Sequence, residues 1–468
     1  MNFGGLKRVF LVGIAGAGMS SLAEVLQGAG LEVIGSDLVL NDMTHYLETL
    51  GIEVMEGHGE QGVVGCDALI YSSAIPPENP ALRMAHQQNI PVVKRAEMLG
   101  EIMKQQQTLA ISGTHGKTTT TLMLGSIWSE GRWNATVMGG GVYCHRQTGT
   151  RMGSSEYLIA EADEYDRSFL SMYPSVILIN NIDADHLECY GTLENLKDAF
   201  IAFTERLPFY GKVVVNIDDK GVASILPRIK KKVITYGQHS NADYRWEREA
   251  RSAGNGFRIC WGQEQESVAE ISLQVGGSHN ASNGAGAFAL SHTLGVPVKQ
   301  IEKGLADFKG VKRRLEFLEE KNGISFYDDY AHHPEEVRVT LNALNEKVCE
   351  TRGLKKRHRL VTIFQPHLYS RTQQFYKEFA LALSGCDRLF VTSVYGSREV
   401  PLEGVEGNLI CDEISREGLE VTYLKNSETM VEDVVKQLHS GDIVVTMGAG
   451  DINLRAREII ESVGELCV

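Results

Sequence analysis

The fold of the middle of this chain is decided by one stretch, residues 111–120, which reads ISGTHGKTTT. An apolar, β-branched run ends at Ser112, small residues follow as far as Gly116, and a threonine-rich segment of helical character begins at Lys117. Small residues let a loop curl so that successive backbone N–H groups face phosphate oxygens, and the helix adds the positive end of its dipole. Lys117 can reach the β- and γ-phosphates of a nucleotide, and the Thr118 hydroxyl can ligate Mg²⁺. The predicted nucleotide contacts are Gly113, Thr114, His115, Gly116, Lys117, Thr118 and Thr119.

The match to the general phosphate loop is incomplete, because Ile111 occupies the place of its first glycine. A glycine, a lysine and a threonine at this spacing also occur at strand–turn–helix junctions that serve only packing. The strand before the loop and the helix after it favour nucleotide binding over that alternative.

Two acidic runs follow later strands of the same region. Residues 161–164 (EADE) come after a strand expected at 157–160, and residues 183–186 (DADH) come after one expected at 176–180. The carboxyl ends of parallel strands meet at one edge of a sheet, so ligands of a nucleotide-bound Mg²⁺ would converge there. Helix N-capping by Asp and Glu is the alternative for either run alone. Together the two runs favour a metal site, with Glu161 and His186 as its predicted ligands.

The N-terminus carries a second glycine-rich loop. Residues 13–18 (GIAGAG) follow an apolar strand and precede a helical segment from about residue 19 to residue 27. Their spacing differs from the dinucleotide pattern, although Asp37 stands after the second strand, where a ribose-binding acid is expected. The loop therefore argues against a plain NAD enzyme. It predicts either a diphosphate against the helix N-terminus or a tight turn that serves packing alone.

The order strand, small-residue loop, helix occurs three times and predicts an α/β fold of three domains with parallel sheets. We expect a Rossmann-like domain at 1–104, a central domain of the phosphate-loop ATPase kind at 105–309, and a second Rossmann-like domain at 310–468. Short alternating segments from Asp243 to Val275, separated by turn residues, predict a small antiparallel β annex on the central domain.

Bulk composition fits an ordinary globular protein. The chain has 468 residues, of which 43% are hydrophobic, and a formal net charge of −14. That charge argues against binding to nucleic acid or to an acidic membrane surface. No run approaches the roughly 18 apolar residues of a membrane span, so no membrane insertion is expected. The eight cysteines form no CxxC pair, which predicts free thiols in a reducing, cytoplasmic setting.

Polar clusters mark the last part of the chain. Residues 277–283 (GSHNASN) precede an alanine-rich helix and predict a loop and a cap, and residues 312–316 (KRRLE) fit a solvated face or a linker. Residues 328–334 (DDYAHHP) gather two acids, a phenol and two imidazoles, but adjacent histidines rarely bind one metal ion together. After the strand expected at 360–364, Arg371 offers a fork for a carboxylate.

Taken in order, these motifs resemble the Mur ligase family, which attaches amino acids to the cell-wall precursor. The resemblance covers essentially the whole chain, and the ordered set is far more specific than any single motif. Its motifs are GIAGAGMS at 13–20, SSAI at 72–75, GTHGKTTTT at 113–121, EADEYD at 161–166, NNIDADHLECYGT at 180–192, HNASN at 279–283, GVKRRLEF at 310–317, DDYAHHPEE at 328–336, FQPHLYSRT at 364–372 and TMGAGDI at 446–452.

The resemblance implies an ATP-dependent ligase of peptidoglycan precursor synthesis that works through an acyl phosphate with Mg²⁺. The sequences FQPHLYSRT and DDYAHHP resemble those of the family branch that joins L-alanine to UDP-N-acetylmuramate. The resemblance also implies a cytoplasmic protein that is a monomer or a weak homodimer. Its implied UDP-sugar contacts are Gly13, Gly16, Gly18, Met19, Ser20, Asp37, Ser72 and Ser73. Further implied contacts are Asn280 and Asn283 to adenine, Asp329 to ribose, Arg314 to the phosphates, His332 or His333 to the amine, and Arg371 to the amino-acid carboxylate.

The chain departs from the family pattern at three places. Leu368 stands where many alanine-adding members have arginine, Ala15 replaces a glycine, and residues 276–278 lack a Pro-Gly-Arg sequence. Three alternatives follow: a ligase that recycles an intact tripeptide, a folate-polyglutamate type of ligase, and a non-catalytic nucleotide sensor. The N-terminal glycine loop disfavours the second, and the presence of Lys117 and Glu161 disfavours the third.

Overall fold

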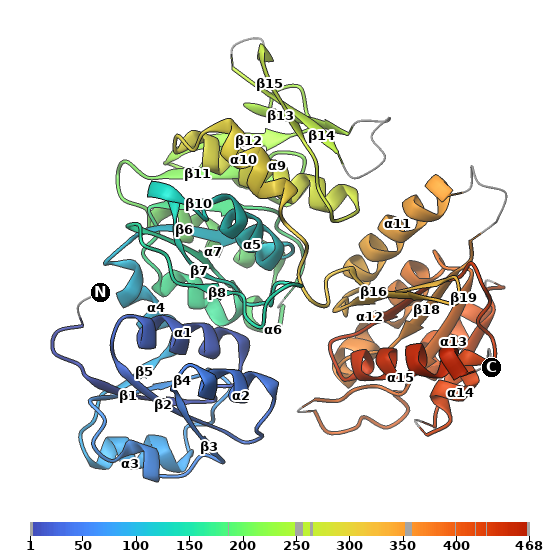
Figure 1. Cartoon of the computed structure of the whole chain (residues 1–468), viewed down its shortest axis with the longest axis horizontal. Coiled ribbons are helices and arrows are strands. Elements are labelled where there is room, and N and C mark those ends of the chain that lie inside the picture. The colour runs from blue at the N-terminus through green and yellow to red at the C-terminus, as the bar shows by residue number, and fades with distance from the viewer. Residues whose placement is uncertain are drawn as a thin grey trace. The chain divides into compact units, whose positions relative to one another are not determined.

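A computed structural model of the chain describes residues 3–185, 187–248, 256–262, 265–351, 358–397, 399–416, 418–426 and 428–465. The predicted metal ligand His186 lies outside these residues. The chain divides into two compact units, one of residues 1–274 with 280–309 and one of residues 275–279 with 310–468. Each unit is built around parallel strands (Figure 1).

The first unit begins with a parallel sheet of five strands in the order β3-β2-β1-β4-β5. The strands are β1 (Arg8–Val12), β2 (Glu32–Asp37), β3 (Glu53–Glu56), β4 (Ala68–Tyr71) and β5 (Val92–Lys94), and the helices are α1 (Ala17–Gly28), α2 (Asp42–Thr49), α3 (Pro80–Gln87) and α4 (Arg95–Met103). Alternate residues of β1 face opposite ways, so Val9 and Leu11 pack with α1 and α4 while Phe10 packs with α3 (Figure 1). The strand order reverses between β1 and β4, which makes their carboxyl ends a switch point for ligand binding.

The same unit contains a sheet of ten strands in the order β15-β14-β13-β12-β11-β10-β6-β9-β7-β8. Its strands are β6 (Gln107–Ser112), β7 (Thr136–Met138), β8 (Thr150–Arg151), β9 (Tyr157–Glu161), β10 (Val176–Ile179), β11 (Lys212–Asn216), β12 (Lys232–Gly237), β13 (Tyr244–Arg248), β14 (Phe257–Trp261) and β15 (Ser267–Ile271). Its helices are α5 (Lys117–Ile127), α6 (Leu187–Tyr190), α7 (Leu193–Glu205), α8 (Lys220–Ile225), α9 (Ser278–Thr293) and α10 (Val298–Ala306). The antiparallel annex is confirmed as β13, β14 and β15, and it continues this sheet through the parallel pair β12–β13.

The second unit holds a sheet of six strands in the order β16-β17-β21-β18-β19-β20, parallel except for the edge hairpin β16–β17. Its strands are β16 (Glu316–Lys321), β17 (Ile324–Asp329), β18 (Leu360–Phe364), β19 (Arg388–Thr392), β20 (Val421–Leu424) and β21 (Ile443–Met447). Its helices are α11 (Pro334–Thr351), α12 (Tyr369–Leu383), α13 (Asn408–Ser415), α14 (Met430–Val435) and α15 (Ile452–Glu465). Helices α11, α12 and α13 cover one face of this sheet, and α14 and α15 cover the other.

The predicted fold class is therefore confirmed, with three α/β domains built on these three sheets. The domain bounds 1–104, 105–309 and 310–468 stay a prediction. One local prediction was wrong: residues 278–283, expected as a loop and cap, form the first turns of α9. Within the described part of the chain, no helix is long and apolar enough to cross a lipid bilayer.

Candidate active site

The phosphate loop lies where four strands of the ten-stranded sheet end side by side. These strands are β10, β6, β9 and β7, and the loop joins β6 to the N-terminus of α5. Gly113 has a φ of 128°, and a Cβ added there would lie 3.0 Å from the backbone N and O of Asn181. Gly116 has a φ of 80°, and its added Cβ would lie 2.7 Å from Oδ1 of Asn283. The structure thus brings Asn283, a predicted adenine contact on α9, against the predicted phosphate loop.

Two asparagines that sequence reasoning gave no role hold the loop from the neighbouring strand. Asn181 accepts a hydrogen bond from the backbone N–H of His115 at 2.7 Å and donates one to its carbonyl oxygen at 3.1 Å. Asn180 also donates to the carbonyl of His115, and to the hydroxyl of Thr120 at 3.1 Å. The available signal was an Asn-Asn pair directly after a buried strand. It could not be assigned, because its partners lie about 65 residues away in sequence.

Lys117 is held at the head of α5 by one carboxylate and two carbonyl groups. Its Nζ donates to Oε2 of Glu164 at 2.8 Å and to the carbonyl oxygens of Gly113 and Thr114 at 2.8 and 3.2 Å. Burial alone lowers the pKa of Lys117, but the carboxylates of Glu164, Asp163 and Glu161 outweigh it and raise the pKa above its ordinary value. Burial acts on Glu164 by raising the pKa of its carboxyl, and Lys117 opposes that rise. The short Nζ–Oε2 distance supports a charged lysine at neutral pH.

Thr118 and Glu161, two of the predicted Mg²⁺ ligands, do meet. The Thr118 hydroxyl donates to Oε2 of Glu161 at 3.1 Å, and the other carboxylate oxygen accepts from the backbone N–H of Gly140. Hard oxygen donors beside a phosphate loop suit Mg²⁺, which takes few protein ligands and keeps water and phosphate oxygens. No group of three or more His, Cys, Asp or Glu side chains among the described residues forms a metal site without such additional ligands.

The N-terminal glycine loop lies at the switch point of the first sheet. Gly13, with a φ of 81°, follows β1, and a Cβ added there would lie 3.5 Å from Cβ of Ser72, which follows β4. Asp37 accepts a hydrogen bond from the backbone N–H of Ala15 at 2.9 Å. The guanidinium of Arg95, at the start of α4, lies against Gly18, whose added Cβ would be 2.9 Å from it. Predicted sugar-nucleotide residues therefore lie together at the N-terminus of α1, with Arg95 as an unpredicted cation beside them.

In the second unit the two adjacent histidines have different surroundings. Nδ1 of His332 lies 2.9 Å from the carbonyl oxygen of Tyr330, which fixes the Nδ1–H tautomer and leaves Nε2 as an acceptor. Burial lowers the pKa of His332, and Arg371 acts in the same direction against the carboxylate of Glu336. The ring of His333 packs edge-on against Phe375, with 5.3 Å between the ring centroids.

His367 lies between Arg371 and His332 and contacts both of them. Nδ1 of His367 is 3.5 Å from a guanidinium nitrogen of Arg371, and its ring centroid is 5.7 Å from that of His332. His367 also stacks on Tyr395 with an interplanar angle of 15°. Burial lowers the pKa of His367 to about 4, and the neighbouring His332 and Arg371 act in the same direction. Sequence reasoning assigned no role to His367 or Tyr395, although His367 belongs to the FQPHLYSRT motif at 364–372.

The remaining predicted residues of this unit are already engaged by the protein. Both carboxylate oxygens of Asp329 accept hydrogen bonds from backbone N–H groups, from Leu315 at 2.6 Å and from Ala331 at 2.7 Å. The side chain therefore links the segment at Leu315 to the segment at Ala331. Arg314 lies 3.6 Å from Glu336. Its neighbour Arg313 donates to the carbonyls of residues 448 and 450, so this member of the basic run is bound by the protein, whereas Lys312 is exposed. The ribose and phosphate contacts of Asp329 and Arg314 stay predictions.

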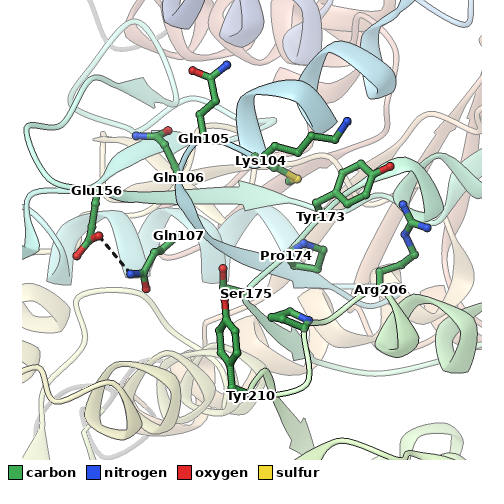
Figure 2. Close-up of a pocket in the computed structure, with 12 residues that line it drawn as sticks. Lys104, Gln105, Gln106, Gln107, Glu156, Tyr173, Pro174, Ser175, Arg206 and Tyr210 are labelled. Atoms are coloured by element: carbon green, nitrogen blue, oxygen red, sulfur yellow. Dashed lines mark hydrogen bonds between the residues drawn. The ribbon is translucent and has the colours of Figure 1, made fainter. Parts of the chain in front are cut away.

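A hollow of about 470 Å³ lies at the opposite edge of the ten-stranded sheet, where strands β6, β9, β10 and β11 begin. Figure 2 shows Tyr173 between Lys104 and Arg206, whose cationic groups lie 4.6 and 4.5 Å from the ring centroid. Lys104 is also paired with Glu101. None of the predicted site residues lines this hollow, so it is separate from the phosphate loop.

Comparison with known proteins gives a consistent result over the whole chain. Three family models match: "Mur ligase family, catalytic domain" at residues 8–107, "Mur ligase middle domain" at 111–291, and "Mur ligase, glutamate ligase domain" at 313–450. The UDP-N-acetylmuramate–L-alanine ligase of Geobacter sp. strain M21 is 40% identical over 451 residues, 96% of each chain. That of Myxococcus xanthus is 38% identical, over 97% of this chain and 94% of the relative. The UDP-N-acetylmuramate–alanine ligase of Thermotoga maritima has a crystal structure with a TM-score of 0.80 at 27% identity, covering 98% of this chain and 100% of that one.

Three α/β sheets and a phosphate loop that carries a lysine, a threonine and a facing glutamate define a nucleotide-binding enzyme of several domains. The matches to family models and relatives make the classification specific. The chain belongs to the Mur ligase family.

Proposed function

We propose that this enzyme joins L-alanine to UDP-N-acetylmuramate with the hydrolysis of ATP to ADP and phosphate, in peptidoglycan precursor synthesis. The observation that carries the proposal is the 40% identity, over 96% of both chains, to a ligase named for that reaction. The phosphate loop and the Arg371 cluster supply groups that this chemistry needs, a cationic phosphate site and a carboxylate site.

The reaction proceeds in two steps. The lactyl carboxylate of the sugar nucleotide attacks the γ-phosphorus of ATP, the bond to the bridging oxygen breaks, and ADP leaves an acyl phosphate behind. The alanine amine then attacks the acyl carbon, the amine loses a proton and inorganic phosphate leaves. Both steps place negative charge on oxygens, so positioned cations and N–H donors provide most of the stabilisation. Lys117 and the amides of residues 113–118 are assigned to the β- and γ-phosphates.

Thr118, Glu161 and His186 are assigned to Mg²⁺, which when bound neutralises charge on the phosphates. On the sugar side, the loop from Gly13 with Asp37, Ser72 and Ser73 is assigned to the UDP group. The approach of Asn283 to Gly116 supports a nucleotide contact from α9, and the adenine is assigned to Asn280 and Asn283.

For the second step, Arg371 is assigned to the alanine carboxylate, because a guanidinium fork matches two carboxylate oxygens. His332 is the better of the two candidates to receive the amine proton, because its Nε2 is left as an acceptor. We further propose a cytoplasmic enzyme, a monomer or weak homodimer, with no nucleic-acid or membrane partner.

The direct test is phosphate release from the purified protein with ATP, Mg²⁺ and UDP-N-acetylmuramate. L-alanine, glycine, L-serine, D-glutamate and the cell-wall tripeptide are compared as acceptors. Release that depends on the sugar nucleotide and is fastest with L-alanine is expected. Faster release with the tripeptide would move the enzyme to the recycling branch, and tight nucleotide binding without turnover would make it a sensor.

A further inference from the structure

All three N–H donors of the Lys117 ammonium group are engaged by acceptors of the protein itself. An ammonium has three N–H donors, and three acceptors surround Nζ: the carbonyl oxygens of Gly113 and Thr114 and Oε2 of Glu164. All three distances are 3.2 Å or less. Lys117 therefore has to give up at least one of these bonds before it can donate to a phosphate oxygen.

Glu164 is the acceptor that a phosphate would most directly replace. It is an anion, as a phosphate is, whereas the two carbonyl groups belong to the loop itself and move only with its backbone. Asp163 is a weaker competitor, because its carboxylate is 3.6 Å from Nζ and its side chain is 42% exposed. The side chain of Glu164 has no exposed surface. Its position is fixed further by the Tyr190 hydroxyl, which donates to the main-chain oxygen of Glu164.

We propose that Glu164 is a positioning residue that occupies Lys117 in place of a nucleotide phosphate, and that nucleotide binding exchanges this carboxylate for the phosphate. The inference rests on the proposed function only in taking ATP and ADP as the ligands of this loop. Glu164 holds the ammonium group of Lys117 next to the loop through the bond to Oε2. Each time product leaves, the carboxylate takes the place of the departing phosphate.

The exchange carries a free-energy cost to which Glu164 contributes most, because its carboxylate is nearer to Nζ than that of Asp163. When Lys117 turns to a phosphate, a buried carboxylate gives up its bond to Lys117 and lies near a second anion, and both changes oppose nucleotide binding. Replacing the carboxylate by a neutral amide of the same shape removes the repulsion and weakens the bond that Lys117 must break. A variant with this neutral amide should therefore bind nucleotide more tightly than the natural protein does.

The test is calorimetric titration of the full-length Glu164→Gln variant with ADP and Mg²⁺. The expected result is a dissociation constant about tenfold lower than that of the natural protein, the size of effect typical of one hydrogen bond to a charged group. A residue that only stabilises the fold would give unchanged or weaker binding, and either result overturns the proposal. Glu194→Gln is the matched control, because it neutralises a glutamate paired with Lys197 at 2.8 Å on an exposed helix surface. It should leave ADP affinity unchanged.

Glu164→Asp provides the second variant if the amide prevents folding. It keeps the charge but withdraws the carboxylate from Nζ by one methylene, so it should also tighten ADP binding, by less than the amide does. Affinity equal to or below that of the natural protein in this variant contradicts the exchange. ADP titration needs neither sugar nucleotide nor amino acid. A failed alanine-transfer assay would therefore overturn the proposed function and leave this measurement standing, and the reverse also holds.

Discussion

At the scale of single residues, Leu368 has a strained backbone conformation with a positive φ. Leu368 has φ 69° and ψ 134° at the N-cap of α12, three residues before Arg371. Non-glycine residues rarely adopt such a conformation, and those that do cost about 1–3 kcal/mol and cluster at functional sites. Its backbone N–H donates to the carbonyl of Tyr395 at 3.0 Å, which ties the strained turn to the loop after β19. The strained turn therefore lies at the start of the helix that carries Arg371.

Leu368→Gly should relieve this strain and raise the free energy of unfolding by about 1 kcal/mol, after the entropy of glycine is subtracted. Urea denaturation measures the change. Leu381→Gly, at an exposed position inside the same helix, should instead lose about 1 kcal/mol. We also expect a higher KM for L-alanine in the Leu368 variant, because a flexible turn holds Arg371 less firmly. A loss of stability at both positions would show that Leu368 is not strained.

The two histidines should separate in a kinetic assay. His332→Ala removes the ring whose Nε2 is left as an acceptor and should lower kcat about 100-fold with L-alanine. His333→Ala removes a ring packed on Phe375 and should lower the melting temperature. Its effect on kcat should be smaller than that of His332→Ala. Steady-state phosphate release and thermal melts of both variants provide the measurements. The assignment reverses if His333→Ala has the larger effect on kcat.

His367 predicts a pH dependence of stability. Its pKa falls from an ordinary value near 6.5 to about 4 in the folded protein, because burial disfavours the charged ring. A depressed pKa means that the unfolded chain binds the proton first, so this contribution to stability is present above about pH 6.5 and is lost as the pH falls towards 4. The melting temperature of the natural protein should therefore drop more steeply between pH 7 and pH 4.5 than that of His367→Gln. Parallel curves would contradict this.

At the scale of elements, the sequence predicted most central strands, because β-branched runs bounded by small residues are typical of buried strands. It missed β3, β7, β8, β12 and the β16–β17 hairpin. Strands β3, β7 and β8 are short and β16 is partly exposed, so their patterns are weak, but β12 and β17 have six residues each and were missed despite their buried positions. Residues 278–283 were expected as a loop because their polar side chains disfavour helices, yet Asn280 and Asn283 are buried on α9. Tertiary context overrides propensity there.

The candidate site divides in the same way. Residues that the loop motif itself contains, such as Lys117 and Thr118, could be predicted from local spacing. Their partners Glu164 and Asn181 could not be chosen from among several similar residues, because the choice depends on which side chain points at the loop after folding. The metal ligand His186 lies outside the described residues, so its prediction is untested.

The phosphate loop requires a glycine at position 113, and this requirement can be tested. In Gly113→Ala, a methyl group would lie 3.0 Å from the backbone of Asn181 and would require an unfavourable positive φ. We expect a loss of ATP affinity of at least tenfold, because the shifted loop no longer aligns its amides. Gly30→Ala is the control, with φ +91 but no atom within 4 Å of the added Cβ. It should cost about 1–2 kcal/mol of stability and leave ATP affinity unchanged. Equal ATP affinity in both variants would show that the loop does not require glycine at position 113.

At the scale of the whole molecule, the predicted groups are divided between the two units. Lys117, Thr118 and Glu161 belong to the first, and His332 and Arg371 belong to the second. An acyl phosphate is destroyed by water, so the chemistry favours closure of the enzyme around its substrates before transfer. We expect the X-ray scattering curve to change when UDP-N-acetylmuramate and a non-hydrolysable ATP analogue are added together. Identical curves with and without both ligands would contradict closure.

The junction inside the first unit has a consequence for how such genes can recombine. The buried hydroxyl of Ser21 on α1 donates to the carbonyl of Gly139 at 2.9 Å, and Thr148 donates to Glu24 at 2.6 Å. Gly28 leaves room for Met152, whose side chain would lie 3.0 Å from an added Cβ. A chimera that exchanged residues 1–104 with those of a distant relative would place new side chains opposite Thr148, Met152 and the carbonyl of Gly139 at once. We therefore expect the N-terminal segment and residues 139–152 to be inherited together, although residues 105–138 separate them along the chain.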